Sequence, residues 1–128
     1  MLICETPPEA KLNFVAKIEA GNVPVFGWHM KHFGDLLFDR TDPAQRAAVV
    51  DRALARLEHG FSIGVFPEGT RSRDGSPSRA IHPALIDAAI RSGVPIQPVA
   101  IAGTLHLIED WRHRHHGHPV YARFGPAR

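Results

Sequence analysis

The sequence is poor in cysteine and has no long apolar run. Its single cysteine, Cys4, excludes an internal disulfide, so nothing indicates an oxidising compartment. No stretch approaches the roughly 18 apolar residues of a membrane span, and the N-terminus lacks the basic and then apolar order of a signal peptide. Internal repeats, low-complexity linkers and the Gly-x-x-x-x-Gly-Lys pattern of a P-loop are also absent. These absences indicate one domain, or a large part of one.

What is present is typical of a globular protein with a basic surface. Hydrophobic residues make up 44% of the chain and charged residues 22%, which argues against disorder. The formal net charge is +2, the pI is about 9.1, and 12 of the 15 cations are arginine. Because arginine binds phosphate in a bidentate fashion, this composition favours partners with phosphate groups or anionic lipid surfaces.

Short apolar runs alternate with helical patterns along the chain. The runs predict strands at residues 12–17, 36–38, 61–66, 96–102 and 120–124. Residues 83–91 are predicted to be a helix that Gly93 stops. Residues 1–9 are predicted to be an irregular lead-in to a domain at 10–128. Strands that alternate with helices predict an α/β fold with a mostly parallel sheet flanked by helices.

The clearest helix signal is Asp42-Pro43, an acidic N-cap followed by proline at the first helical position. His59-Gly60 is expected to end this helix, since glycine adopts positive φ easily. The predicted buried face follows the helical rhythm of Ala47, Val50, Leu54 and Leu57.

Residues 18–33 are apolar but interrupted, because Pro24 and Gly27 break the pattern. Any helix there is therefore expected to be short or kinked. Trp and Phe favour the membrane interface, so residues 23–28 could rest on a bilayer surface. Core burial is the alternative, and it is our prediction for most of these side chains.

Polar residues follow two of the predicted strands. Asp39-Arg40 comes after the strand at 36–38, and residues 68–71 come after the strand at 61–66. Ligands of open α/β sheets bind beyond the carboxyl ends of the strands, so both segments are predicted to lie on one edge. Gly69 permits a tight bend, and Arg71 could form a bidentate fork to a phosphate or carboxylate. A plain surface turn with a Glu–Arg pair is the alternative.

Three sequence blocks give a more specific indication. They are Gly34-Asp35-Leu36-Leu37-Phe38-Asp39-Arg40, Phe66-Pro67-Glu68-Gly69-Thr70-Arg71-Ser72 and Val94-Pro95-Ile96-Gln97-Pro98-Val99. In this order and spacing they resemble the second, third and fourth blocks of the glycerolipid acyltransferases, the lysophosphatidic acid acyltransferase family. The resemblance runs from about Ala10 to the C-terminus.

The resemblance implies an O-acyltransferase of phospholipid biosynthesis. The acyl group would pass from acyl-CoA or acyl carrier protein, as co-substrate, to a lysophosphatidic-acid-type acceptor, without a metal or other cofactor. It implies a cytoplasmic protein held peripherally at the membrane. The phosphate or glycerol portion of the acceptor would be bound by Arg40, Glu68, Gly69, Thr70 and Arg71.

Three further assignments stay open at this stage. Lys17 is a further candidate cation at the same edge, or a solvated strand-end lysine. Arg40 could instead form a salt bridge with Asp39 or Asp42. Residues 94–96 either shape the floor of the site or pack in the core.

The family's catalytic His-x-x-x-x-Asp block lies before the stretch that matches residues 14–17, and this sequence begins too late to contain it. We therefore assign no catalytic residue and expect the 128-residue chain to be inactive through truncation. The literal match from His82 to Asp87 has Pro83 in a first helical turn, which places Asp87 about 140° around the helix from His82. We reject it as the missing pair. A non-catalytic module that binds a lipid phosphate or a partner is the alternative function.

Histidines gather near the C-terminal end, at His106, His113, His115, His116 and His118. Arginines lie between them and would repel a metal cation. Aromatic residues for stacking nucleic-acid bases are sparse in this stretch. We interpret it as a solvated loop, with neither a metal nor a nucleic-acid partner.

Overall fold

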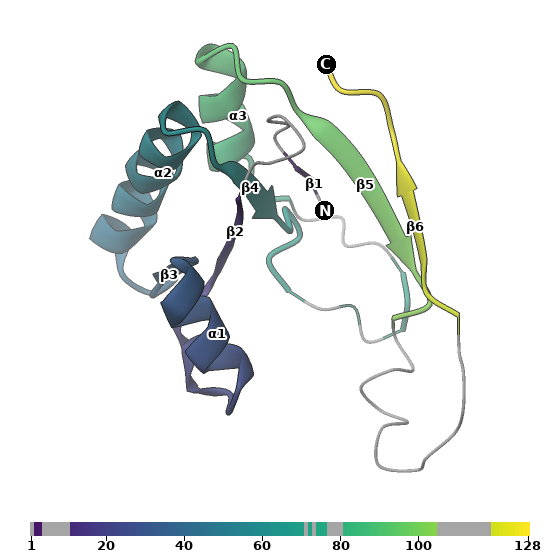
Figure 1. Ribbon diagram of the computed structural model, residues 1–128, viewed down its shortest axis with the longest axis horizontal. Coiled ribbons are helices and arrows are strands. Elements are labelled where there is room, and N and C mark those ends of the chain that lie inside the picture. The colour runs from purple at the N-terminus through teal and green to yellow at the C-terminus, as the bar shows by residue number, and fades with distance from the viewer. Residues whose placement is uncertain (1, 4–10, 71, 73, 77–80, 105–118) are drawn as a thin grey trace.

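The computed structural model describes residues 2–3, 11–70, 72, 74–76, 81–104 and 119–128. Its elements are arranged around one sheet, with helices against it (Figure 1). In chain order they are β1 (Leu2–Ile3), β2 (Leu12–Lys17), the 3-10 helix η1 (Ile18–Asn22), α1 (Phe26–Phe33), β3 (Leu36–Phe38), α2 (Pro43–Glu58), β4 (Ser62–Val65), α3 (Ala84–Arg91), β5 (Gln97–Ala102) and β6 (Tyr121–Phe124).

The described strands form a six-stranded sheet in the order β3-β2-β4-β1-β5-β6. β2 is parallel to β3 and β4, whereas β1 is antiparallel to β4 and β5 and β6 is antiparallel to β5. β2, β3, β4 and β5 therefore run in one direction. The predicted α/β class, with helices flanking the sheet, is confirmed.

β1 lies inside the stretch for which no regular element was expected. Leu2 is level with Val65 on one side and with Pro98 on the other. Two strands that face each other across a gap offer free backbone donors and acceptors on both sides. This pairing, which sequence periodicity over two residues cannot indicate, explains the strand.

α2 begins where Asp42-Pro43 predicts. The Asp42 carboxylate accepts hydrogen bonds from the Ala44 N–H at 2.8 Å and the Gln45 N–H at 3.3 Å, as an N-cap should. The buried face of the helix differs from the prediction, because its centre is Val49 and Ala53 and Ala47 is exposed.

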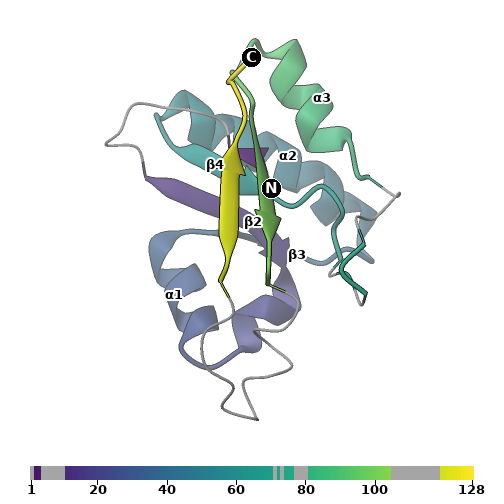
Figure 2. The ribbon, with the colours of Figure 1, turned by 90° about the vertical axis from the view of Figure 1, so that its right-hand side faces the viewer.

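The packing of the core explains why a different face of α2 is buried. Leu36 of β3, Ile63 of β4, Val49 and Ala53 form one buried cluster, and Ala53 is fully buried. A small side chain at this position lets the helix approach the sheet closely. α2 also packs against α3, and Figure 2 shows both helices behind the β5–β6 pair.

The segment 18–33 forms η1 and then α1, so the expected short, interrupted helix is confirmed. The prediction of core burial for most of residues 23–28 is wrong: Val23, Val25, Phe26 and Trp28 are exposed. Close approach of backbones is the physical reason, since a Cβ on Gly27 would collide with the carbonyl of Gly21. The glycines therefore face inward and the large side chains face outward.

Membrane-spanning helices were searched for in the described residues. None of the helices there is long and apolar enough to cross a bilayer.

Candidate functional site

The carboxyl ends of β2, β3 and β4 meet at one edge of the sheet, as the sequence predicts. Lys17, the last residue of β2, is level with Phe38, the last residue of β3. Arg40 follows two residues later, and the turn after β4 brings Gly69 beneath the Arg40 guanidinium. We call the group of Arg40, Gly69 and His82 the cationic rim.

Gly69 is required by the geometry of this turn. Its φ is +61°, and its N–H donates to the Phe66 carbonyl at 3.0 Å. A Cβ at this position would collide with the Arg40 guanidinium and with the His82 ring. Only glycine combines this φ with such close contact at low cost. The turn is therefore shaped around the arginine.

His82 is the rim residue that the sequence analysis missed as a binding residue. Its Nε2 lies 3.2 Å from an Arg40 terminal nitrogen. Since a guanidinium can only donate, Arg40 is the donor and Nε2 the acceptor of this hydrogen bond. The His82 N–H also donates to the Pro67 carbonyl at 2.8 Å, which closes the loop that begins after β4. The contact with Arg40 spans 42 residues, so no local pattern could have revealed it.

The acidic neighbours of Arg40 are engaged elsewhere. The Asp39 carboxylate accepts from the Thr41 hydroxyl at 2.7 Å and the Thr41 N–H at 2.8 Å. Both bonds lower the pKa of Asp39, and the bond from the Thr41 hydroxyl has the larger effect. The pKa of Asp42 is lowered mainly by the Gln45 side-chain amide, 3.0 Å away, and then by the helix N–H groups. Both carboxylates therefore accept from other donors, and the side-chain contact that Arg40 makes is with His82. This favours the contact with His82 over the alternative of a salt bridge to Asp39 or Asp42.

The remaining predicted site residues are placed as follows. Glu68 is half-buried in the turn, and Thr70 and Lys17 are exposed. Arg71 lies outside the described residues, as does the histidine-rich stretch 106–118.

The two ends of the literal His-x-x-x-x-Asp match have different partners. His82 contacts Arg40, while Asp87, in α3, donates its N–H to the Pro83 carbonyl. Within the described ranges, no three His, Cys, Asp or Glu side chains converge as a metal site.

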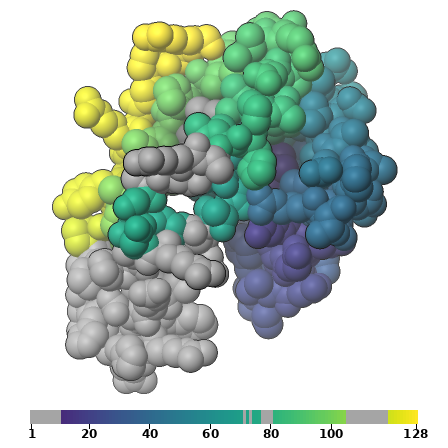
Figure 3. All heavy atoms as spheres, turned by 180° about the vertical axis from the view of Figure 1, so that it is seen from behind, coloured from purple at the N-terminus to yellow at the C-terminus, as the bar shows by residue number. Residues whose placement is uncertain are grey.

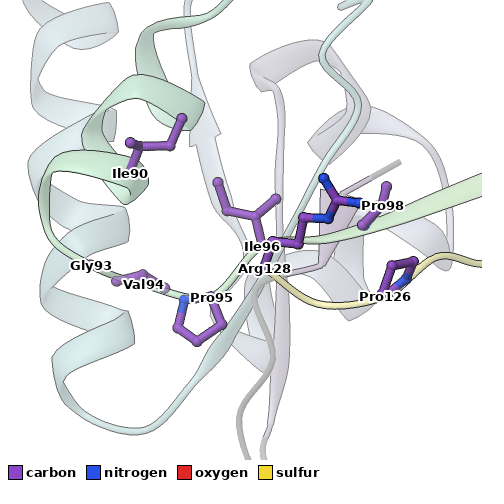
Figure 4. Close-up of a pocket in the computed structure, with 8 residues that line it drawn as sticks. All are labelled: Ile90, Gly93, Val94, Pro95, Ile96, Pro98, Pro126 and Arg128. Carbon is purple, nitrogen blue, oxygen red and sulfur yellow. The ribbon is translucent and has the colours of Figure 1, made fainter.

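A separate apolar cavity of about 620 Å³ opens between the end of α3 and the start of β5 (Figure 4). Val94, Pro95 and Ile96 line it, together with Ile90 of α3 and Arg128. The residues expected to form the floor of the site or part of the core therefore border this cavity, and none of the rim residues does.

Chemically, the rim offers a guanidinium and an imidazole that both pack against a glycine turn. Arginine in such a setting binds phosphate or carboxylate through charge-assisted hydrogen bonds. The fold and this rim define an α/β protein with a cationic edge at the carboxyl ends of its parallel strands.

Comparison with known proteins gives the family. Residues 1–102 match the family model described as Acyltransferase, and the chain belongs to this family. It is 35% identical over 91 residues to a chloroplastic 1-acyl-sn-glycerol-3-phosphate acyltransferase of Brassica napus, covering 71% of this chain and 26% of that protein. It is 34% identical over 93 residues to the lyso-ornithine lipid O-acyltransferase of Pseudomonas aeruginosa, covering 73% of this chain and 35% of that protein.

A solved structure shares the fold. The 1-acyl-sn-glycerophosphate acyltransferase PlsC of Thermotoga maritima superposes with a TM-score of 0.66 at 30% identity, over 92% of this chain and 46% of that one. The predicted glycerolipid acyltransferase family and α/β fold are confirmed. The chain spans about a quarter to a third of the two enzymes above and under half of the Thermotoga enzyme.

Proposed function

We propose that this chain forms the acceptor-binding part of an O-acyltransferase. The enzyme transfers an acyl group from a thioester donor, acyl-CoA or acyl carrier protein, to a hydroxyl of a lysophosphatidic-acid-type lipid. The observation that carries the proposal is the Arg40 guanidinium seated on the Gly69 turn and bonded to His82. The names of the similar enzymes supply the acceptor class.

In this proposal the rim holds the acceptor by its phosphate. Arg40 supplies charge and parallel donors, and Gly69 lets the Arg40 guanidinium pack directly on the turn, since a Cβ there would collide with it. Thr70 and Lys17 add donors around the rim, and Glu68 orients those of the turn. Arg71, a candidate from the sequence alone, is proposed to bind the same phosphate. The thioester carbonyl must then meet the acceptor hydroxyl, a reaction that needs a general base and an oxyanion stabiliser. The proposal assigns neither of these to a described residue.

The location follows from the proposed substrate. A lysophospholipid acceptor partitions into bilayers, so the enzyme works at a membrane surface, which we propose is the cytoplasmic one. The attachment is peripheral in this proposal.

Binding of a soluble headgroup tests the rim directly. Glycerol 3-phosphate, titrated calorimetrically into the chain, is expected to bind, and Arg40→Ala is expected to weaken binding at least about tenfold. Arg91→Ala is the matched control, because Arg91 is an exposed arginine in the last turn of α3. Equal affinities for the two variants would remove Arg40 from the site.

A thioester-release assay with acyl-CoA and lysophosphatidic acid tests the transfer. Turnover that disappears in Arg40→Ala supports the acyltransferase. Because the 128-residue chain is expected to be inactive, the assay is run on it both as given and with any in-frame residues encoded upstream of Met1 restored. Headgroup binding without turnover by both folded forms favours the non-catalytic lipid-phosphate module instead.

A further inference from the structure

We propose that this protein lies on an anionic phospholipid bilayer through a surface formed by η1 and α1. This surface, the η1–α1 face, consists of the exposed residues Ile18, Val23, Val25, Phe26, Trp28 and Phe33. The proposal rests on the proposed function, because a lipid acceptor must pass from a membrane to the cationic rim. It adds which surface meets the membrane and which lipid charge that surface prefers.

The η1–α1 face exposes large apolar side chains that a core would normally bury. Val25 is 82% exposed, Trp28 61% and Phe33 60%. Isolated exposed apolar residues are ordinary, but six within the 16 residues from Ile18 to Phe33 are a concentration of the kind that marks an interaction site. In Figure 3 these elements, in purple and blue, project as a lobe at one end of the molecule.

The outward direction of these side chains is built into the fold. Gly27 and Met30 are the buried residues of α1, and Gly27 sits against the carbonyl of Gly21. Helical spacing then turns Trp28 and His32 away from the sheet. Their rings stack with centroids 4.3 Å apart, and those of His29 and Phe33 do the same. The aromatic rings thus stand on the outer face of a helix whose inner side is already occupied.

Charge identifies the partner as an anionic bilayer. Lys17, directly before η1, and Lys31 of α1 are exposed, although the Lys31 side chain lies beside Gly21, and Glu19 is the single acid between residues 17 and 34. Trp and Phe favour the headgroup level of a bilayer, while neighbouring lysines gain from anionic lipids. Lysines are depleted in protein–protein interfaces, so the two lysines here favour a lipid surface over a protein partner.

The segment that carries the η1–α1 face begins at the same edge of the sheet as the cationic rim. η1 begins directly after Lys17, which ends β2 and is level with Phe38, and Arg40 lies two residues beyond Phe38. Both surfaces therefore start at the same edge of the sheet. A bilayer in contact with α1 would lie beside the site where an acceptor headgroup binds.

Vesicle sedimentation tests the proposal on the chain as it is. We expect binding to vesicles of phosphatidylcholine with 30% phosphatidylglycerol, and at least about tenfold weaker binding to phosphatidylcholine alone. Phe26→Ser with Trp28→Ser is expected to weaken binding to the anionic vesicles at least about tenfold, since two large apolar side chains are lost. Tyr121→Ser with Phe124→Ser is the matched control: both residues are exposed aromatics, on β6, and that variant should bind like the unaltered chain.

A spectroscopic measurement keeps the test independent of whether the Ser variant folds. The sequence has two tryptophans, so Trp111→Phe leaves Trp28 as the single emitter. Its emission should shift to the blue on addition of anionic vesicles, and brominated lipids should quench it. Vesicle binding without either change would overturn the proposal, because another surface would then be responsible.

Two other results would overturn it. The first is absence of vesicle binding by the folded chain. The second is a dimer that Phe26→Ser with Trp28→Ser converts to a monomer while vesicle binding stays unchanged, which would show a second copy covering the face. The vesicles contain no acceptor lipid, and glycerol 3-phosphate binding is measured without vesicles. Failure of the membrane proposal is therefore distinguishable from failure of the proposed function.

Discussion

Gly69 shows how much of the cationic rim depends on one missing side chain. Its positive φ disfavours other residues, and its contact with Arg40 and His82 leaves no room for a Cβ. Gly69→Ala should therefore weaken glycerol 3-phosphate binding at least about tenfold, because Arg40 must move, besides the roughly 1–2 kcal/mol cost of the left-handed backbone. Calorimetric titration and thermal unfolding measure the two effects.

Gly60→Ala separates those two effects. Gly60 has a φ of +78°, and an added Cβ there would have no neighbour within 4 Å. This variant should lose stability like Gly69→Ala but keep its affinity. If both variants bound the headgroup equally well, the close packing of Arg40 on Gly69 would have no part in binding.

Gly27 is the second glycine whose size is decisive. A Cβ there would meet the Gly21 backbone, which cannot rotate away, so Gly27→Ala should cost about 1–3 kcal/mol in urea unfolding. Gly21→Ala is the control, since an added Cβ there would meet the movable side chains of Leu37 and Lys31 and should cost less. A neutral Gly27→Ala would contradict the account of how α1 is oriented.

At the scale of elements, α2 depends on the Asp42 cap. Asp42→Ala leaves the Ala44 and Gln45 N–H groups without that acceptor, and should lower the Tm by about 3–6 °C. Asp51→Ala changes an exposed aspartate within the same helix and should shift the Tm by less. A similar shift for both would mean that helix propensity, and not the cap, sets the stability of α2.

The whole molecule should lose stability in acid. The pKa values of Asp39, Asp42 and Asp74 are lowered, each chiefly by hydrogen bonds: from Thr41 for Asp39, from Gln45 for Asp42 and from Ser76 for Asp74. The unfolded chain then binds more protons near pH 4, so stability rises with pH there. The contribution is present above the ordinary value of 3.8 and is lost as pH falls through the lower folded values.

Thermal unfolding between pH 6 and pH 3 checks this expectation. The Tm should fall with pH, and less steeply in Asp39→Asn than in the unaltered chain. A Tm independent of pH over this range would show that these carboxyl groups titrate alike in the folded and the unfolded chain, and would contradict the lowered pKa values.

The helix and strand layout was largely predictable, because the signals are local. The strands at 12–17 and 36–38 coincide with β2 and β3, and Asp42-Pro43 starts α2. Proline and glycine mark these boundaries through their own backbone preferences, whatever lies elsewhere in the fold. The buried face of α2 was only partly predicted, since apolar spacing does not report how closely a helix approaches the sheet.

Of the cationic rim, the sequence by itself determined that Arg40 and the Gly69 turn follow parallel strands and so share an edge. Only the tertiary structure decided that His82 joins them, because this contact depends on how a loop of many residues closes. It also decided that the aromatic residues Phe26, Trp28 and Phe33 of α1 are exposed. The sequence shows that these residues are apolar. Which way their side chains face was set by the backbone contact between Gly21 and Gly27.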